Sequence, residues 1–384
     1  MVDVSGIRYF DHAATSWPKP PGVAEAMCRV LTEAGGNPGR GAHALALAAA
    51  RTVAQARSQV SALLGVPDSA DMAFVPGCTE GLNLVLKGAL APGDRVVVSA
   101  VEHNAVARPL AVLAARGVEV VRVAPDPEGR IDADDVERAV RQAPTRMVVC
   151  QHASNVTGAI HPVGDVADIA HEQGALMVVD GAQAAGHLHV DVAALGADAY
   201  VVPGHKGLLG PQGVGVLCLA AGFEPDELVQ GGSGGNSEDA IQPRVRPDRY
   251  EAGTANTPGI AGLGVAAGYL LERGEAVRAS EQRLTRRLCE GLADLPGVTV
   301  LGPQPGVERV PVVSVVHSRL APDELAFALD RRWGIAVRAG LHCSPWAHEA
   351  AGTLETGALR FSLGWDLTDE DVDAALDAMR ELCA

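Results

Sequence analysis

The sequence predicts an α/β protein with a large domain built on a mainly parallel sheet and a smaller α+β domain toward the C-terminus. Short apolar runs rich in β-branched residues alternate with helix-like segments through much of the first 220 residues. Continuous apolar strands of this kind are typical of a parallel sheet that helices cover on both faces. From about Ile260 a long helical pattern and a few separate strands replace this alternation, and 384 residues suit two or three domains.

The strands and helices of the larger domain are expected at short intervals along the chain. Several of the helix-like segments have an acidic or capping residue near their start, as helix N-termini favour. We expect strands at 95–99, 118–123, 146–151, 175–180, 199–202 and 213–219, and helices at 106–116, 133–142 and 163–173.

The region after residue 260 is expected to contain a second, smaller set of elements. Strands are predicted at 312–316, 336–338 and 359–362, followed by a closing amphipathic helix at 369–382. Residues 229–254 lie between the two regions and are rich in Gly and Pro, which predicts a long functional loop.

The charge balance argues against nucleic acid and anionic membranes as partners. Lys and Arg number 31 against 47 Asp and Glu, which gives a formal net charge of −16, and there is no dense basic block. No apolar run approaches the ~18 residues that a membrane-spanning helix needs. The N-terminal residues also lack the charged and apolar segments of a secretion signal. We therefore expect a cytoplasmic enzyme.

The seven cysteines are scattered and never form a C-x-x-C pair. Neither a disulfide framework nor a structural zinc site fits this spacing, and we expect no metal. Cys150 and Cys218 lie in apolar runs, where a cysteine is usually a small buried apolar residue. Cys343, in "AGLHCSP", has polar and turn-forming neighbours instead, so it is a candidate nucleophile.

Polar or ionisable side chains follow four successive strands of the expected sheet. Ligands of open α/β sheets bind beyond the carboxyl ends of the strands, so these side chains are expected to share one rim. Any one of them alone is more often structural, but four groups together indicate a site. They are Glu102, His103 and Asn104, then His152 and Asn155, then Asp180 and Gln183, and finally His205 and Lys206.

This set of residue types suits pyridoxal 5'-phosphate. A lysine amine forms a Schiff base with an aldehyde, and an acid that faces a pyridine nitrogen keeps it protonated, which makes the ring an electron sink. Lys206 and Asp180 have those roles available. Gly77, Cys78 and Thr79 precede a helix expected near Glu80, whose N-terminus would offer free amides to a phosphate.

The chain resembles the cysteine desulfurase and selenocysteine lyase family, the class V branch of the fold-type I pyridoxal-phosphate enzymes, over essentially its whole length. The segments that carry the resemblance are "YFDHAATSWPKP", "GNPGRGAH", "GCTEGLNLVLKG", "EHNAVARPL", "HASNVTGAIHPV", "VVDGAQAAGHLHVDV", "GHKGLLGPQGVGVL", "EAGTANTPGI", "VRAGLHCSP" and "LRFSLGWDLT". The resemblance implies a seven-stranded, mainly parallel sheet and a homodimer with two composite active sites.

The same resemblance implies a division of the chain into three parts. Residues 1–20 would be an arm that belongs to the small domain, 21–259 the large cofactor-binding domain, and 260–384 the small domain with the catalytic-cysteine loop.

Matching to the family also implies a role for each site residue. Lys206 would bond to the cofactor, Asp180 would partner its pyridine nitrogen, Gln183 would reach its phenolic oxygen, and His103 would stack on its ring. The phosphate would be held by Cys78, Thr79 and His205, with Thr254 from the other subunit. Asn155, Arg338 and Arg360 would contact substrate, and Arg360 would bind its carboxylate bidentately.

Cys343 occupies the position of the family's thiolate, which attacks the sulfur of bound L-cysteine and becomes a persulfide while L-alanine is released. The short spacing from Cys343 to Arg360 resembles the branch with a compact cysteine loop, which favours transfer of sulfur to a docked protein or small-molecule acceptor.

Four positions depart from the commonest family pattern. His12 replaces an asparagine, Cys78 a threonine or serine, Pro203 a hydroxyl residue, and Leu341 a histidine two residues before the cysteine. Two alternatives therefore stay open beside the desulfurase. One is a selenocysteine lyase or a related C–S lyase or aminotransferase, and the other is a partner-dependent sulfur-relay or scaffold protein with little activity alone.

Overall fold

The computed structural model describes residues 6–39, 41–232, 238 and 240–384. Part of the expected loop at 229–254 lies outside the described residues, and the described part contains no helix or strand. None of the helices in these ranges combines the length and the apolar character that crossing a bilayer requires.

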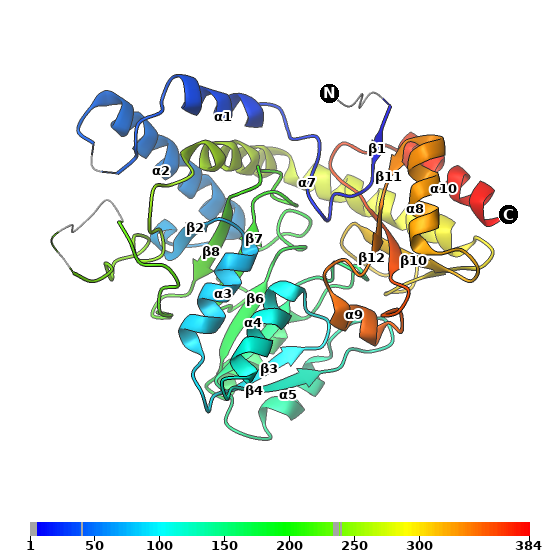
Figure 1. Ribbon diagram of the computed structural model, residues 1–384, viewed down its shortest axis with the longest axis horizontal. Coiled ribbons are helices and arrows are strands. Elements are labelled where there is room, and N and C mark those ends of the chain that lie inside the picture. Colours follow the sequence, from blue (N-terminus) through cyan, green and yellow to red (C-terminus); the bar gives the residue numbers. More distant parts are fainter. Residues whose placement is uncertain (1–5, 40, 233–237, 239) are drawn as a thin grey trace.

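The larger part of the molecule is built on a seven-stranded sheet, as the resemblance implies (Figure 1). Its order is β2-β8-β7-β6-β5-β3-β4, and only β8 runs antiparallel to the strands beside it. The strands are β2 (Met72–Val75), β3 (Arg95–Ser99), β4 (Glu119–Val123), β5 (Met147–Gln151), β6 (Leu176–Asp180), β7 (Ala199–Pro203) and β8 (Gly215–Leu219).

Helices cover both faces of this sheet. One face packs against α3 (Cys78–Ala89) and α4 (Asn104–Ala114). The other packs against α2 (Ala44–Leu64), α5 (Ala133–Val140), α6 (Val163–Glu172) and part of α7 (Thr257–Ala293). α1 (Val23–Thr32) lies against α7.

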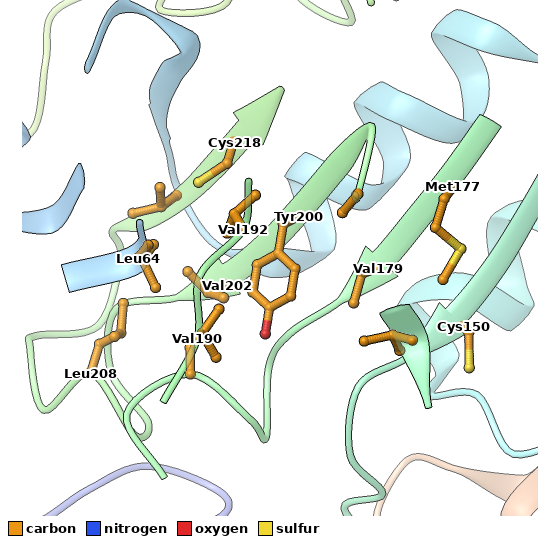
Figure 2. Close-up of a cluster of buried hydrophobic side chains, with 14 of the residues drawn as sticks. Leu64, Cys150, Met177, Val179, Val190, Val192, Tyr200, Val202, Leu208 and Cys218 are labelled. Atoms are coloured by element: carbon orange, nitrogen blue, oxygen red, sulfur yellow. The ribbon is translucent and has the colours of Figure 1, made fainter. Parts of the chain in front are cut away.

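Each face of the sheet has its own hydrophobic core, and alternate residues of each strand pack into one core or the other, because successive side chains of a strand point to opposite faces. Met177, Val179, Tyr200, Val202 and Cys218 point into the core of the second face, where Figure 2 shows them side by side. Their neighbours Val178 and Val201 point into the core of the first face.

The smaller part of the molecule contains a four-stranded antiparallel sheet of order β12-β13-β10-β9. Its strands are β9 (Val298–Val300), β10 (Val312–His317), β12 (Arg338–Gly340) and β13 (Ala358–Ser362). α8 (Pro322–Trp333) and α10 (Asp369–Cys383) pack on it, and α9 (Pro345–Ala350) follows the cysteine loop.

One expected strand of the smaller part is divided in the structure. The run expected at 336–338 forms two short strands that belong to different sheets. β11 (Ile335–Ala336) pairs in parallel with β1 (Arg8–Tyr9), whereas β12 pairs with β13. The residues of β1 therefore contact the smaller part, and the assignment of residues 1–20 to that part stays a prediction.

Helix α7 is shared by both parts. Ile260, Leu263 and Leu270 pack in the core under the large sheet, whereas Leu284 and Leu292 pack in the core of the smaller part. Figure 1 shows it running from beside α1 and α2 to beside α10. The boundary between 259 and 260 stays a prediction.

Candidate active site

A cavity of about 670 Å³ opens at the carboxyl ends of the large-sheet strands. Of the twelve residues to which the resemblance assigns a role, eleven line it: Cys78, Thr79, His103, Asn155, Asp180, Gln183, His205, Lys206, Arg338, Cys343 and Arg360. Glu102, Asn104 and His152, which also follow the strand ends, do not line it. The eleven lining residues come from both parts of the molecule, so the cavity lies where the two parts meet.

Thr254 is the one residue with a role implied by the resemblance that does not line this cavity. It is exposed in the segment before α7. Its expected role lies in the site of a second subunit, so that assignment stays a prediction.

Lys206 and Asp180 are placed by the ends of β7 and β6. Asp180 is the last residue of β6, and it is buried, while Lys206 follows β7 in a tight turn. Burial lowers the pKa of Lys206, and the Asp180 carboxylate partly offsets that effect. A lysine with a lowered pKa is more often in the neutral form that attacks an aldehyde.

The Asp180 carboxylate is held in place by two donors. Its Oδ1 accepts hydrogen bonds from the Cys78 thiol at 3.3 Å and from the amide of Ala182 at 3.0 Å. Burial, followed by the charge of Asp180, raises the pKa of the Cys78 thiol well above its ordinary value. Cys78 is therefore a neutral donor beside Asp180, a contact that the sequence did not predict.

The start of helix α3 lines this cavity. Gly77 precedes the helix, and a Cβ atom there would have no neighbour within 4 Å. Thr79, in the first turn, lines the same cavity as His205. Free amide groups and the helix dipole attract a phosphate to such a terminus.

Three buried polar atoms of the cavity-lining residues have no hydrogen-bond partner among the described residues. They are Nδ1 of His205, Oε1 of Gln183 and Nε of Arg360. The other end of the Gln183 amide donates to the Ala13 carbonyl at 3.0 Å. Buried polar atoms seldom remain unpaired in proteins, so these three atoms fit the polar groups of a bound cofactor and substrate.

His103 links the site to helix α4. Its Nδ1 accepts a hydrogen bond from the amide of Ala105 at 3.0 Å and caps the helix. Burial, and then the charge of Lys206, lowers the pKa of His103 to about 4. The ring is therefore neutral at neutral pH, with its proton on Nε2, and its flat face is available for stacking.

Arg360 lies in the middle of the sheet of the smaller part and is almost fully buried. It donates to Asp11 Oδ1 at 2.8 Å and to the Asn155 carbonyl at 3.1 Å. Arg338 is its direct neighbour on β12. Two guanidinium groups thus face the cavity together, which suits an amino-acid carboxylate. The partner Asp11 was missed, because 349 positions separate it from Arg360.

Asn155 and Asn104, from the larger part of the molecule, hold the loop that carries Cys343. The amide of Asn155 donates to the His342 carbonyl at 2.7 Å, and Ser344 Oγ donates back to Asn155 Oδ1 at 2.7 Å. The amide of Asn104 donates to the Cys343 carbonyl at 2.8 Å. Cys343 is exposed toward the cavity, and Arg338 Nη2 is 3.9 Å from its sulfur.

The four departures from the family pattern occupy different places. Cys78 and Pro203 line the cavity, and Leu341 is exposed beside Cys343. His12 is buried outside the cavity lining, with Nε2 3.5 Å from Asp366.

Comparisons with known proteins agree with this geometry. A family model described as aminotransferase class-V matches residues 8–375. The probable cysteine desulfurase of Methanothermobacter thermautotrophicus is 34% identical over 381 residues, which cover 97% of this chain and 94% of that protein.

Solved structures give the same result. The apo cysteine desulfurase of Thermococcus onnurineus has a TM-score of 0.92 and 33% identity, covering 98% of this chain and 94% of that one. The cysteine desulfurase CsdA of Escherichia coli has a TM-score of 0.88 and 30% identity, with coverages of 98% and 95%. The chain therefore belongs to the class-V aminotransferase family and, within it, to the pyridoxal-phosphate-dependent cysteine desulfurases.

Proposed function

We propose that this chain converts L-cysteine to L-alanine and takes the sulfur onto Cys343. The observation that carries this proposal is the placement of the Cys343 thiol in the same cavity as Lys206, Arg338 and Arg360. A scaffold without activity would not need a half-buried lysine, a buried acid and an accessible thiol around one space.

Different residues of the cavity hold the cofactor and the substrate. Bound pyridoxal phosphate supplies an electron sink for the bond-breaking steps. Lys206 holds the cofactor and moves protons at its Nζ, while Asp180 keeps a proton on the pyridine nitrogen. Arg360 and Arg338 bind the substrate carboxylate.

Cys343 acts on the sulfur of the substrate. Its thiolate forms a new S–S bond while the Cβ–S bond of the substrate breaks. The electron pair of the broken bond stays with the substrate carbon, which then takes a proton to become the methyl group of alanine. The persulfide on Cys343 is later passed to a thiol acceptor.

Three further assignments belong to this proposal. The enzyme acts as a homodimer in which Thr254 reaches the partner's phosphate site, and residues 1–20, 21–259 and 260–384 form the arm, the large domain and the small domain. All seven cysteines are free in the structure, which suits a reducing compartment such as the cytoplasm.

The central test of the function is Cys343→Ser. We expect this variant to bind pyridoxal phosphate and L-cysteine with the parental spectral change but to lose alanine and sulfide production, because a serine hydroxyl is not ionised near neutral pH. Cys28→Ser, at another exposed cysteine, is the matched control. Full alanine production by Cys343→Ser would show that the proposed sulfur transfer is wrong, and pyruvate in place of alanine would indicate an eliminase.

The cofactor assignment is tested at Lys206. The chain has three lysines, Lys19, Lys87 and Lys206. We expect Lys206→Ala to lose the borohydride-reducible bond to pyridoxal phosphate that mass spectrometry detects in the parent. Lys87→Ala, at an exposed position near the end of α3, should keep it. Parental trapping in Lys206→Ala would refute the assignment.

A further inference from the structure

Three side chains, His342, His348 and Thr353, form a series of hydrogen bonds that begins in the Cys343 loop. His342 Nε2 is 3.4 Å from the Arg338 carbonyl, His342 Nδ1 is 3.3 Å from His348 Nε2, and His348 Nδ1 is 2.7 Å from Thr353 Oγ1. The two rings are tilted by 31°, with centroids 5.4 Å apart. All three side chains are buried, and neither His348 nor Thr353 lines the cavity.

The direction of every hydrogen bond in this series follows from its first member. A carbonyl only accepts, so His342 carries its proton on Nε2 and donates to Arg338. Its Nδ1 is then an acceptor and takes a hydrogen bond from His348 Nε2. His348 Nδ1 is an acceptor in turn, and the Thr353 hydroxyl donates to it.

Burial keeps both rings neutral, as this series requires. It lowers the pKa of His342 to about 2 and the pKa of His348 to about 4, and the charge of Arg360 adds to both effects. His342 therefore does not take the proton of Cys343, and its contribution is geometric.

The backbone of the loop has a conformation that needs support. His342 and Cys343 have φ angles of 49° and 58°, in the left-handed region that residues other than glycine seldom adopt. Such strain persists only where the surroundings hold it. Asn155 and Asn104 hold the two carbonyl groups, whereas the His342 ring is held through His348 and Thr353.

We propose that His348 and Thr353 are positioning residues that fix the His342 ring and thereby hold the Cys343 thiol in its reactive place. This proposal rests on the function proposed above, because it assigns a role in sulfur transfer to Cys343. Substrate binding uses other residues, so the two positions act on the transfer step and not on affinity.

Thr353 allows a narrow test of this proposal. Its backbone amide donates to the His348 carbonyl and its carbonyl accepts from Gly357, so the turn does not depend on the hydroxyl. Thr353→Val removes the last donor and keeps the shape of the side chain. Thr356, in the same turn, is exposed, and its hydroxyl contacts only the Gly357 carbonyl. Thr356→Val is therefore the matched control.

We expect Thr353→Val to lower kcat for alanine formation on the order of tenfold or more, as small misplacements of a reacting group do. The KM for L-cysteine and the cofactor spectrum should stay parental. Thr353→Ser should restore kcat, and Thr356→Val should match the parent. His348→Gln, whose amide can still donate toward His342, should keep more of kcat than His348→Ala.

Hydrogen exchange of the peptide covering 339–349 gives a second measurement that does not need turnover. Thr353→Val should exchange faster than the parent, and Thr356→Val should not. Parental kcat together with parental exchange in Thr353→Val would overturn the proposal, as would a loss that Thr353→Ser fails to restore. If the parent itself makes no alanine, the proposed function fails, and the exchange comparison still decides whether Thr353 holds the loop.

Discussion

The buried His12 shows how one side chain restricts its neighbours. The ring makes an edge contact with Tyr9 at 5.0 Å and is 2% exposed. Burial lowers the pKa of His12 to about 3 and raises the pKa of Asp366 to about 6, so the two groups do not form an ion pair at neutral pH. A Cβ atom at Gly364 would overlap the His12 ring. Gly364 thus leaves the space that His12 fills.

We expect Gly364→Ala to destabilise the protein by about 1–3 kcal/mol, the usual result of overpacking a buried site. The penalty should shrink in a chain that also carries His12→Ala, because the ring that clashes is gone. Chemical denaturation of the two single variants and the double variant measures this coupling.

The control for this pair is Gly164→Ala in α6, where the nearest atom to the new Cβ is Leu195 Cδ2 at 3.9 Å. It should be neutral or slightly stabilising. Equal destabilisation by Gly364→Ala with and without the His12 ring would show that the ring is not the cause.

Most of the site could be predicted from single residues, because the ends of parallel strands bring their following residues to one rim. This rule placed His103, Asp180 and Lys206 correctly around one cavity. The rule does not apply to Asp11 or Thr353, because neither residue follows a strand of the large sheet. Their partners are set by the packing of distant or irregular segments. The spacing of two histidines around a short helix gave no recognisable motif.

At the scale of elements, helices α2 and α7 approach closely because small residues line their contact. A Cβ atom at Gly264 of α7 would lie 2.7 Å from the Cβ of Ala56 in α2. One turn further on, a Cβ at Gly268 would lie 3.0 Å from Gln59 Nε2. Helix backbones approach this closely only where side chains are small.

We expect Gly264→Leu to destabilise the protein by more than about 2 kcal/mol, because the new side chain has no room between the helices. Ala279→Leu, at an exposed position of the same helix, should change stability by less than about 0.5 kcal/mol. Thermal unfolding of the three proteins makes the comparison. A Gly264→Leu variant as stable as the parent would mean that α2 and α7 separate at little cost.

Some strands were located accurately from the sequence and others were missed, and the difference has physical causes. The central strands β3, β5 and β6 are continuous apolar runs and were found within a residue of their observed limits. The edge strand β2 has four residues, too few to tell a strand from another buried segment. Hydrophobic pattern also did not reveal that β11 and β12 belong to different sheets, since a change of partner leaves no mark in the sequence.

For the molecule as a whole, buried histidines dominate the expected response to acid. Burial lowers the pKa of seven of the twelve histidines to values between about 2 and about 4: His12, His103, His152, His161, His205, His342 and His348. In the unfolded chain they bind a proton near pH 6.5. The unfolded state therefore binds more protons between these values.

Stability should accordingly fall as the pH is lowered from about 6.5 toward 4. Burial also raises the pKa of Glu102 to about 8 and that of Asp366 to about 6. Above about pH 4.5 these two carboxyl groups bind more protons in the folded state, so their contribution to stability rises as the pH is lowered. The seven histidines outnumber them. We expect the free energy of unfolding to be lower at pH 5 than at pH 7 by more than about 2 kcal/mol.

Urea unfolding at several pH values tests this expectation. His161→Gln should reduce the slope with pH, because it removes one buried imidazole, whereas His189→Gln, at an exposed position, should leave the slope unchanged. A free energy of unfolding that is flat or rises from pH 7 to pH 5 would contradict the histidine account.

Helix α7 also limits how such a chain can be reshaped by recombination. Its residues up to Leu270 pack in one hydrophobic core and its residues from Leu284 onward pack in the other, so the two sets of contacts are separated along the helix. A crossover between residues 270 and 284 of two diverged relatives would leave each core with the helix half that evolved with it. Exchanges that keep the whole helix with one parent leave one core mismatched, so recombination is expected to be tolerated best inside the helix.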